Sequence, residues 1–119
     1  MKRWVGSDEF ITIIVRKDLA PGYKLAQSVH AIADFSVEHE ESFKEWQKNS
    51  NYLCCLEASD FQIDVIRSKL DELKIKYTVF LEPDIGNVLT SIAVEAIPRE
   101  LHKKLFKNYK LSLSWEIQK

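Results

Sequence analysis

The run FITIIVR, residues 10–16, constrains the fold more than any other part of the chain. It is β-branched and almost uniformly apolar, and it lacks the alternation of a strand that has one face in water. This pattern predicts a central strand that is covered on both faces. Helices on both sides of a sheet provide that cover, so the run favours an α/β domain. At 119 residues and 45% hydrophobic content, the chain is long enough for one such domain.

Further strands and helices alternate along the chain. Later strands are predicted at residues 52–58, 76–82 and 88–97, with the alternating LSLSW, 111–115, as an edge strand. Helices are predicted after Pro21-Gly22, at about residues 40–47, after an N-cap at Ser59 with Ile63, Ile66, Leu70 and Leu73 at helical spacing, and from Pro98 through Leu101 and Leu105. We therefore expect a single three-layer α/β/α domain with a mixed four- to five-stranded sheet and a core spanning about residues 10–116.

The first helix is predicted to have a buried and an exposed face. Helical spacing places a mostly aliphatic set of side chains on one side of the helix, namely Leu25, Val29, Ile32, Ala33 and Ser36. The opposite side carries Gln27, His30, Ala31 and Asp34. The aliphatic set is expected to face the sheet, which would leave the polar set in solvent.

The charge distribution is uneven, although the formal net charge is only −1. Residues 34–45 carry a net −4, and residues 97–119 carry a net +4. The net charge of the chain therefore does not indicate a nucleic-acid partner. If the protein binds a nucleic acid, the contact has to come from a local positive patch. Lys103, Lys104 and Lys107 form one candidate, and solvated charged surface is the plainer interpretation.

The cysteines and histidines do not predict a metal site. Cys54 and Cys55 are adjacent in a strand-like run, so their side chains face opposite ways, and we interpret them as reduced core residues. His30, His39 and His102 lack a metal-ligand spacing, and no Gly-rich phosphate loop is present. No apolar run approaches the roughly 18 residues of a membrane span, and the first residues lack a signal-peptide block, so a cytoplasmic protein is expected.

Polar chemistry is concentrated in RKDLAPGYKLAQSVHA, residues 16–31. Lys17 and Asp18 leave the first strand where an open α/β sheet presents its crevice, and Lys24 lies in the first turn of the next helix. Lysines at a helix N-terminus suit a phosphate, a carboxylate or an oxyanion. His30 and Asp34 are four residues apart, so the carboxylate can fix the imidazole as a base or substrate binder. The alternatives are ordinary surface lysines and a structural histidine.

A second candidate is Asp84, in the loop EPDIGN. Catalytic groups concentrate on such loops. If the loop meets the end of the first strand, Asp84 would face Lys17 or Lys24 and remain ionised, able to orient a water. The alternative is that Asp84 only makes the turn, because aspartate is a preferred turn residue.

Together, RKDLAPGYKLAQSVHA and the later EPDIGNVLTSIAVEA resemble the type II peptidyl-tRNA hydrolase family, over about residues 10–115. The resemblance implies a compact α/β domain that hydrolyses the ester between a peptide and the 3′ end of tRNA during translation, without a metal or cofactor and often as a homodimer. The matching positions are Arg16, Asp18, Leu19, Lys24, Gln27, His30 and Ala31, then Asp84, Gly86 and Thr90.

The leading hypothesis gives roles to these residues and to Lys17, which is chosen for its place at the end of the first strand and not from the resemblance. Asp84, Lys17 and His30 would be catalytic, with Asp84 on the attacking water and Lys17 on the phosphate or oxyanion. Substrate binding would fall to Lys24, Gln27, Arg16, Asp18 and Thr90. The implied partners are tRNA and a second copy of the chain, with no DNA or membrane.

Two departures from the family pattern keep other functions open. The turn before the helix is short, and NVLT replaces the Thr-Gln that normally follows the D-x-G element. These departures motivate a non-catalytic tRNA- or protein-binding module as the alternative, and a hydrolase of small acyl compounds as a third possibility. Trp4, Trp46 and Trp115 are candidates for an interface or for the core.

Overall fold

The structure, a computed structural model, describes residues 8–113. Its strands are β1 (Phe10–Arg16), β2 (Tyr52–Ala58), β3 (Tyr77–Glu82), β4 (Val88–Ile97) and β5 (Lys110–Leu111). Its helices are α1 (Pro21–Glu38), α2 (Glu40–Lys48), α3 (Asp60–Glu72) and α4 (Arg99–Phe106), with a 3₁₀ turn at Pro83–Ile85. The strands form one sheet in the order β3-β4-β1-β2-β5.

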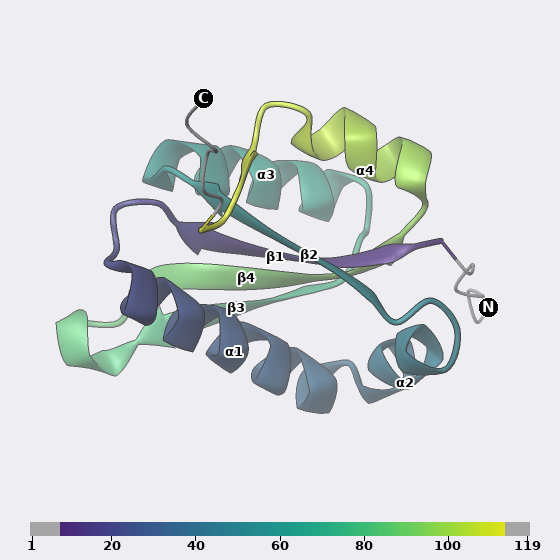
Figure 1. The fold of residues 1–119 in the computed structure, drawn as a ribbon, viewed down its shortest axis with the longest axis horizontal. Helices are drawn as coiled ribbons and strands as arrows, with labels where there is room; N and C mark the ends of the chain where they lie inside the picture. The colour runs from purple at the N-terminus through teal and green to yellow at the C-terminus, as the bar shows by residue number, and fades with distance from the viewer. Residues whose placement is uncertain (1–7, 114–119) are drawn as a thin grey trace, which may run out of the picture.

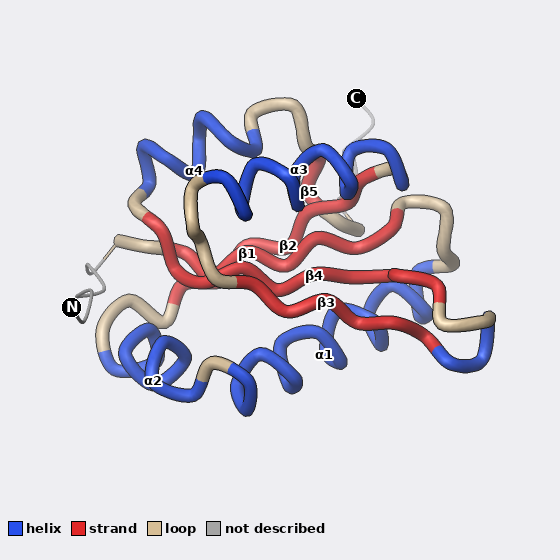
Figure 2. Tube along the Cα trace, turned by 180° about the vertical axis from the view of Figure 1, so that it is seen from behind, coloured by secondary structure: helices blue, strands red, loops and turns tan. Residues whose placement is uncertain are grey.

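The sheet is mixed and lies between two helical layers. α1 and α2 cover one face, and α3 and α4 cover the other (Figure 1); the same layers appear from behind in Figure 2. β1 is parallel to β2, while β4 is antiparallel to both β1 and β3. The carboxyl ends of β1, β2 and β3 consequently share one edge of the sheet. The predicted three-layer α/β/α domain is confirmed.

The central strand β1 separates two apolar cores. Ile11 and Ile13 pack on the α1 side with Phe35, whereas Ile14 packs on the α3 side with Ile66. The prediction from FITIIVR that both faces are covered is therefore confirmed. The two cysteines divide in the same way: Cys54 packs against the α3 core and Cys55 against the α1 core, and both are free thiols.

The predicted faces of α1 are partly wrong: Ile32 packs against the core and His30 and Asp34 are exposed as expected, but the other assignments differ. The helix buries Gln27, Ser28, Ala31 and Phe35 against the sheet. Leu25 and Val29, expected in the core, are 59% and 56% exposed, and Val37 extends this apolar stripe. The reason is packing: small side chains let the helix approach the strands, the Phe35 ring fills the core, and the Gln27 amide finds polar partners there. Counting aliphatic side chains alone missed both effects.

Other local predictions are confirmed more closely. Ser59 caps α3 through a capping box: its hydroxyl accepts from the Gln62 backbone N–H, and the Gln62 side chain accepts from the Ser59 N–H. Leu73 lies just past the helix and is half exposed, unlike Leu70. The last strand, β5, covers Lys110–Leu111, so of the predicted LSLSW it includes Leu111 but neither Ser112 nor Leu113. Ser114 and Trp115 lie outside the described residues.

The tryptophan prediction is tested at one position. Trp46 is 7% exposed, and its indole N–H donates to the Tyr52 carbonyl at 2.6 Å. This residue belongs to the core. Trp4 and Trp115 lie outside the described residues. None of the helices within residues 8–113 is both long and apolar enough to cross a bilayer.

Candidate functional site

The residues singled out from the sequence gather at the edge of the sheet where β1, β2 and β3 end. β1 ends at Arg16, and the chain then turns into α1, whose first residues lie over the same edge (Figure 1). The β3–β4 connection carries Asp84 at this edge because β3 runs parallel to β1. Such an edge is where open α/β sheets bind ligands. The fold therefore brings the two sequence motifs to one end of the molecule.

A buried hydrogen-bond network joins the two motifs. Gln27 of α1 is 1% exposed, and its Nε2 donates to Glu82 Oε2 at 3.0 Å. The Thr90 hydroxyl of β4 donates to Gln27 Oε1. Ser91 Oγ donates to the Gln27 backbone carbonyl at 2.7 Å. Gln27 thus holds the Glu82 carboxylate beneath the surface, and Thr90 holds the Gln27 amide. Both residues help to position the loop that carries Asp84.

An irregularity in the β3–β4 pairing makes this network possible. Leu81 pairs with Leu89, whereas Phe80 pairs with Ser91, so Thr90 is an extra residue between the two pairs. Successive residues of a regular strand point to opposite faces. The bulge turns both Thr90 and Ser91 toward Gln27, which is the kind of local re-aiming that bulges produce next to functional sites.

Glu82 is the carboxylate at the centre of the network. The hydrogen bond from Gln27 lowers the pKa of Glu82, and the backbone N–H of Asp84 and the nearby His30 act in the same direction, against the effect of burial. The Asp84 N–H lies 3.4 Å from Glu82 Oε1. The carboxylate is 6% exposed. Its negative charge is therefore held directly below the loop that carries Asp84.

Tyr23 brings a phenol to the same place from the first turn of α1. Burial raises the pKa of Tyr23, and the negative charges of Glu82 and Asp84 raise it further. The phenol accordingly keeps its proton and is available as a hydrogen-bond donor. The sequence pattern gave no role to Tyr23.

Asp84 lies on the 3₁₀ turn and is exposed. Gly86 ends this turn with a φ of 82°, the left-handed conformation that favours glycine. Within residues 8–113 neither Lys17 nor Lys24 forms an ion pair with Asp84. The expected lysine–aspartate pairing is wrong for Lys24, because the Lys24 amine lies 3.0 Å from Glu57 Oε2 of β2.

His30 does not form the expected pair with Asp34. Its ring stacks on Phe80 of β3, with centroids 4.4 Å apart and planes 6° from parallel. No hydrogen bond joins His30 to Asp34, two residues that the structure describes. The stacking holds the imidazole over β3, close enough for its charge to influence Glu82.

The two cations at the end of β1, Arg16 and Lys17, differ in their ion pairing within the described residues. Arg16 binds Asp18 through two contacts, Nε to Oδ1 at 3.0 Å and a terminal nitrogen to Oδ2 at 2.5 Å. It also contacts Asp60 Oδ1 at 2.9 Å. Arg16 thereby lowers the pKa of Asp18. The exposed Lys17 side chain, by contrast, makes no ion pair with any residue of the described part of the chain.

Sequence reasoning missed Glu82, Glu57 and Asp60, the three acids that organise this edge. Glu82 was visible as the last residue of a predicted strand, two positions before Asp84. The partners of Glu57 and Asp60 are distant in sequence, so their pairing left no local signal. Among residues 8–113, no three His, Cys, Asp or Glu side chains converge as metal ligands would.

Comparison with known proteins supports the fold. No family model matches the sequence, and no curated protein matches it. A solved structure of a protein of unknown function from Agrobacterium tumefaciens strain C58 is similar, with a TM-score of 0.65 and 18% identity. The match covers 87% of this chain and 97% of that chain. At this identity the similarity shows a shared fold over nearly the whole of both chains.

Proposed function

We propose that this protein hydrolyses the ester of peptidyl-tRNA, as the resemblance to the type II peptidyl-tRNA hydrolase family implies. The observation that supports the proposal best is the contact between the two motifs. Gln27 of the first motif bonds to Glu82 and Thr90, which flank Asp84 of the second. These residues are 55 and 63 positions from Gln27, and their packing supports an exposed carboxylate on a constrained turn.

Asp84 is the proposed general base. Its carboxylate takes a proton from a water molecule, whose oxygen attacks the ester carbonyl carbon. The carbonyl oxygen becomes an oxyanion, which a lysine amine stabilises. When the tetrahedral intermediate collapses, the carbon–oxygen bond to the ribose breaks, and the ribose oxygen takes the proton back. The products are a free tRNA hydroxyl and a peptide carboxylic acid, which loses its remaining proton to solvent and becomes a carboxylate.

Lys17 is the proposed cation for the oxyanion or the terminal phosphate. It is exposed and makes no ion pair within residues 8–113, so binding an anion costs it no existing partner. Lys24 is held by Glu57 and Arg16 by two acids. Tyr23 and His30 are proposed to orient the substrate, Tyr23 as a phenol donor and His30 through its stacked imidazole.

The tRNA body is proposed to contact the lysines of α4 and the turn after it. Lys103, Lys104 and Lys107 are exposed there. Neutralising phosphates with lysines releases counterions, so we expect turnover at low substrate concentration to fall steeply with added salt. A salt-independent rate would remove these lysines from the proposal.

The direct test measures release of labelled peptide from peptidyl-tRNA by the wild type and by Asp84→Asn, with EDTA present. Asp84→Asn keeps the shape of the side chain and removes the base, so we expect turnover to fall by about 100-fold or more. Glu72→Gln, the same chemical change at an exposed site on α3, is the matched control and should leave turnover intact. Equal turnover by the wild type and Asp84→Asn would refute the proposed base.

A non-catalytic binding module is the second candidate function. The observation that favours it is electrostatic: Lys24 and Arg16 are both engaged by carboxylates, which leaves Glu82 and Asp84 without a paired cation in the described part of the chain. This candidate predicts tRNA or partner binding that is unchanged in Asp84→Asn, and no hydrolysis by the pure wild-type protein. Clear wild-type turnover would dispose of it.

We further propose that the homodimer implied by the resemblance forms through the outer face of α1. The helix carries the exposed stripe Leu25, Val29 and Val37, and it has no acid in its first turn and no base in its last. Asp34 and Glu38 lie near its carboxyl end, where the helix dipole disfavours negative charge. A two-fold related copy packed antiparallel would place its positive helix N-terminus beside these acids and offset that cost.

A further inference from the structure

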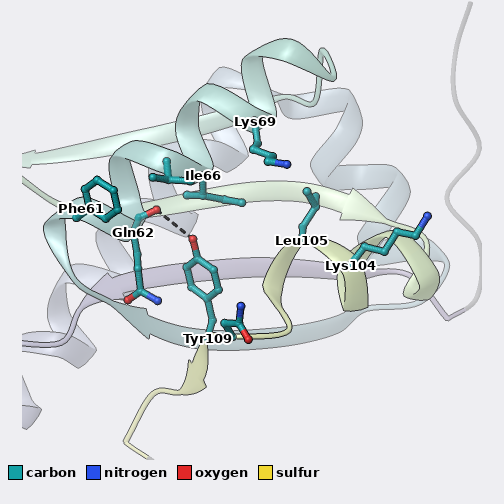
Figure 3. A pocket seen from close by; sticks show the side chains of 9 residues that line it. Phe61, Gln62, Ile66, Lys69, Lys104, Leu105 and Tyr109 are labelled. Atoms are coloured by element: carbon teal, nitrogen blue, oxygen red, sulfur yellow. Dashed lines mark hydrogen bonds between the residues drawn. The ribbon is translucent and has the colours of Figure 1, made fainter.

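A groove between α3 and α4 (Figure 3) lies on the face of the sheet opposite α1 (Figure 1). Its volume is about 260 Å³, close to the lower limit of roughly 300 Å³ for small-ligand sites. Apolar side chains form most of its lining, from Phe61, Val65 and Ile66 on α3 and from Leu105 and Tyr109 on and after α4. Phe61 is 74% exposed, so a large ring stands at one end of the groove with little cover.

Two polar residues of the lining, Gln62 and Tyr109, already have hydrogen-bond partners. The Tyr109 hydroxyl donates to the Gln62 backbone carbonyl at 3.0 Å (Figure 3). The Gln62 side-chain oxygen accepts from the Ser59 N–H in the capping box. Burial raises the pKa of Tyr109, which keeps this phenol neutral. Asn108 is the other amide of the lining. The groove therefore offers an occupant mainly apolar contact and few hydrogen-bond acceptors.

Two lysines supply charge at the other end. Lys69 of α3 and Lys104 of α4 line the groove on the side away from Phe61 (Figure 3). Neither amine forms an ion pair or hydrogen bond with another residue of the described range 8–113. Two unpaired cations beside an apolar surface attract an anion and repel a cation.

We propose that this groove is a binding site for a small organic carboxylate with an aromatic or branched apolar body. The body packs between Phe61, Ile66 and Leu105, and the carboxylate reaches Lys69 and Lys104. A carboxylate needs donors alone, which two ammonium groups provide. A nucleobase needs both donors and acceptors on its edge, and among the amide oxygens of the lining only that of Asn108 is not used by another described residue. The proposal does not rest on ester hydrolysis at the Asp84 edge, although Lys104 also belongs to the surface proposed to contact tRNA.

The test is a titration of the full-length protein, followed through its backbone amide NMR signals. The probe is 3-phenylpropionate, and 3-phenylpropylamine, acetate and adenosine monophosphate are the comparison ligands. For a ligand of this size in an open groove we expect a Kd on the order of 1 mM. The shifts should cluster on α3 and α4. The amine, which has the same body and the opposite charge, and acetate, which lacks the body, should bind at least about tenfold more weakly.

Variants at exposed positions separate charge from folding. Lys69→Gln combined with Lys104→Gln should weaken phenylpropionate binding by about tenfold. Lys103→Gln removes the same charge from α4 outside the groove lining, and it should leave the Kd unchanged. Phe61→Ser should weaken binding without altering the dispersion of the amide spectrum, because this ring is already exposed.

Several results would overturn the proposal. They are an absence of shifts at saturating probe, shifts that map away from α3 and α4, equal binding of the amine, or equal weakening by Lys103→Gln. Tighter binding of adenosine monophosphate than of phenylpropionate would show that the groove prefers a nucleotide, and the proposed carboxylate ligand would then be wrong. Since no tRNA is present in these titrations, their failure would leave the hydrolase proposal untouched.

Discussion

Gln27 Nε2 donates to Glu82 Oε2 across 3.0 Å, and this bond joins two residues 55 positions apart. It fixes the first turns of α1 to the end of β3, directly below Asp84. The geometry of the candidate site therefore depends on a buried amide that would not itself touch a substrate.

Replacing Gln27 with methionine should destabilise the fold by about 1–3 kcal/mol, because the Thr90 hydroxyl and the Glu82 carboxylate lose their partner in the interior. Thr90→Val should cost about 1 kcal/mol. Urea unfolding measures both free energies. The double variant should lose less than the sum of the singles, since the two residues share one bond. Strict additivity would contradict the network.

The pair Lys24–Glu57 should contribute coupling energy of about 1 kcal/mol, since both side chains are largely covered. A double-mutant cycle with Lys24→Gln and Glu57→Gln, read by urea unfolding, measures it. The matched surface pair is Lys44–Glu40, whose side chains are 60% and 64% exposed and which should couple more weakly, because solvent screens it. A coupling near zero at Lys24–Glu57 would mean that the Lys24 amine is free to bind substrate.

Acidification should destabilise the protein through His102. Burial and the neighbouring Arg99 lower the pKa of His102 below its ordinary 6.5, and its Nδ1 lies 3.1 Å from Thr12 Oγ1. The unfolded chain therefore binds a proton at higher pH than the folded chain does. The free energy of unfolding should fall as the pH drops through about 6.5 toward the folded pKa, and then stay reduced.

His102→Asn isolates this effect. Urea unfolding of the wild type and the variant between about pH 7.5 and 5 should show a steeper decline for the wild type. Parallel curves would show that His102 does not carry the linkage.

Val29→Lys should convert a dimer to a monomer, because it places a charge in the exposed stripe of α1. Sedimentation velocity gives the mass, and thermal unfolding of the monomeric variant checks that the fold persists. Ser68→Lys adds the same charge at an exposed site on α3 and should leave the mass unchanged. A wild-type protein that is monomeric at high micromolar concentration would refute the α1 interface.

The sequence by itself determined the order and type of the elements. β-branched runs, the Ser59 cap and the loop before β4 act within a few residues of where they stand, so their structural effect can be predicted locally. Pro21 and Gly22, expected to precede the first helix, are instead its first two residues, since proline is well suited to the first turn of a helix. The local signals placed β1, β2 and β4 at their observed bounds. They also placed Cys54 and Cys55 on opposite faces, because side chains alternate along any strand.

Only the tertiary structure decided which face of α1 is buried and which carboxylate each cation binds. Leu25 and Val29 have the spacing of a core face, yet Phe35 and Gln27 occupy the interior. The reason is that close packing of α1 against the sheet matters more than the number of aliphatic side chains on one face of the helix. Lys24 could equally have faced Asp84. It pairs with Glu57, 33 residues away, because the sheet order places β2 beside β1. Contacts over such separations depend on how strands and helices assemble, and no local pattern in the sequence records that assembly.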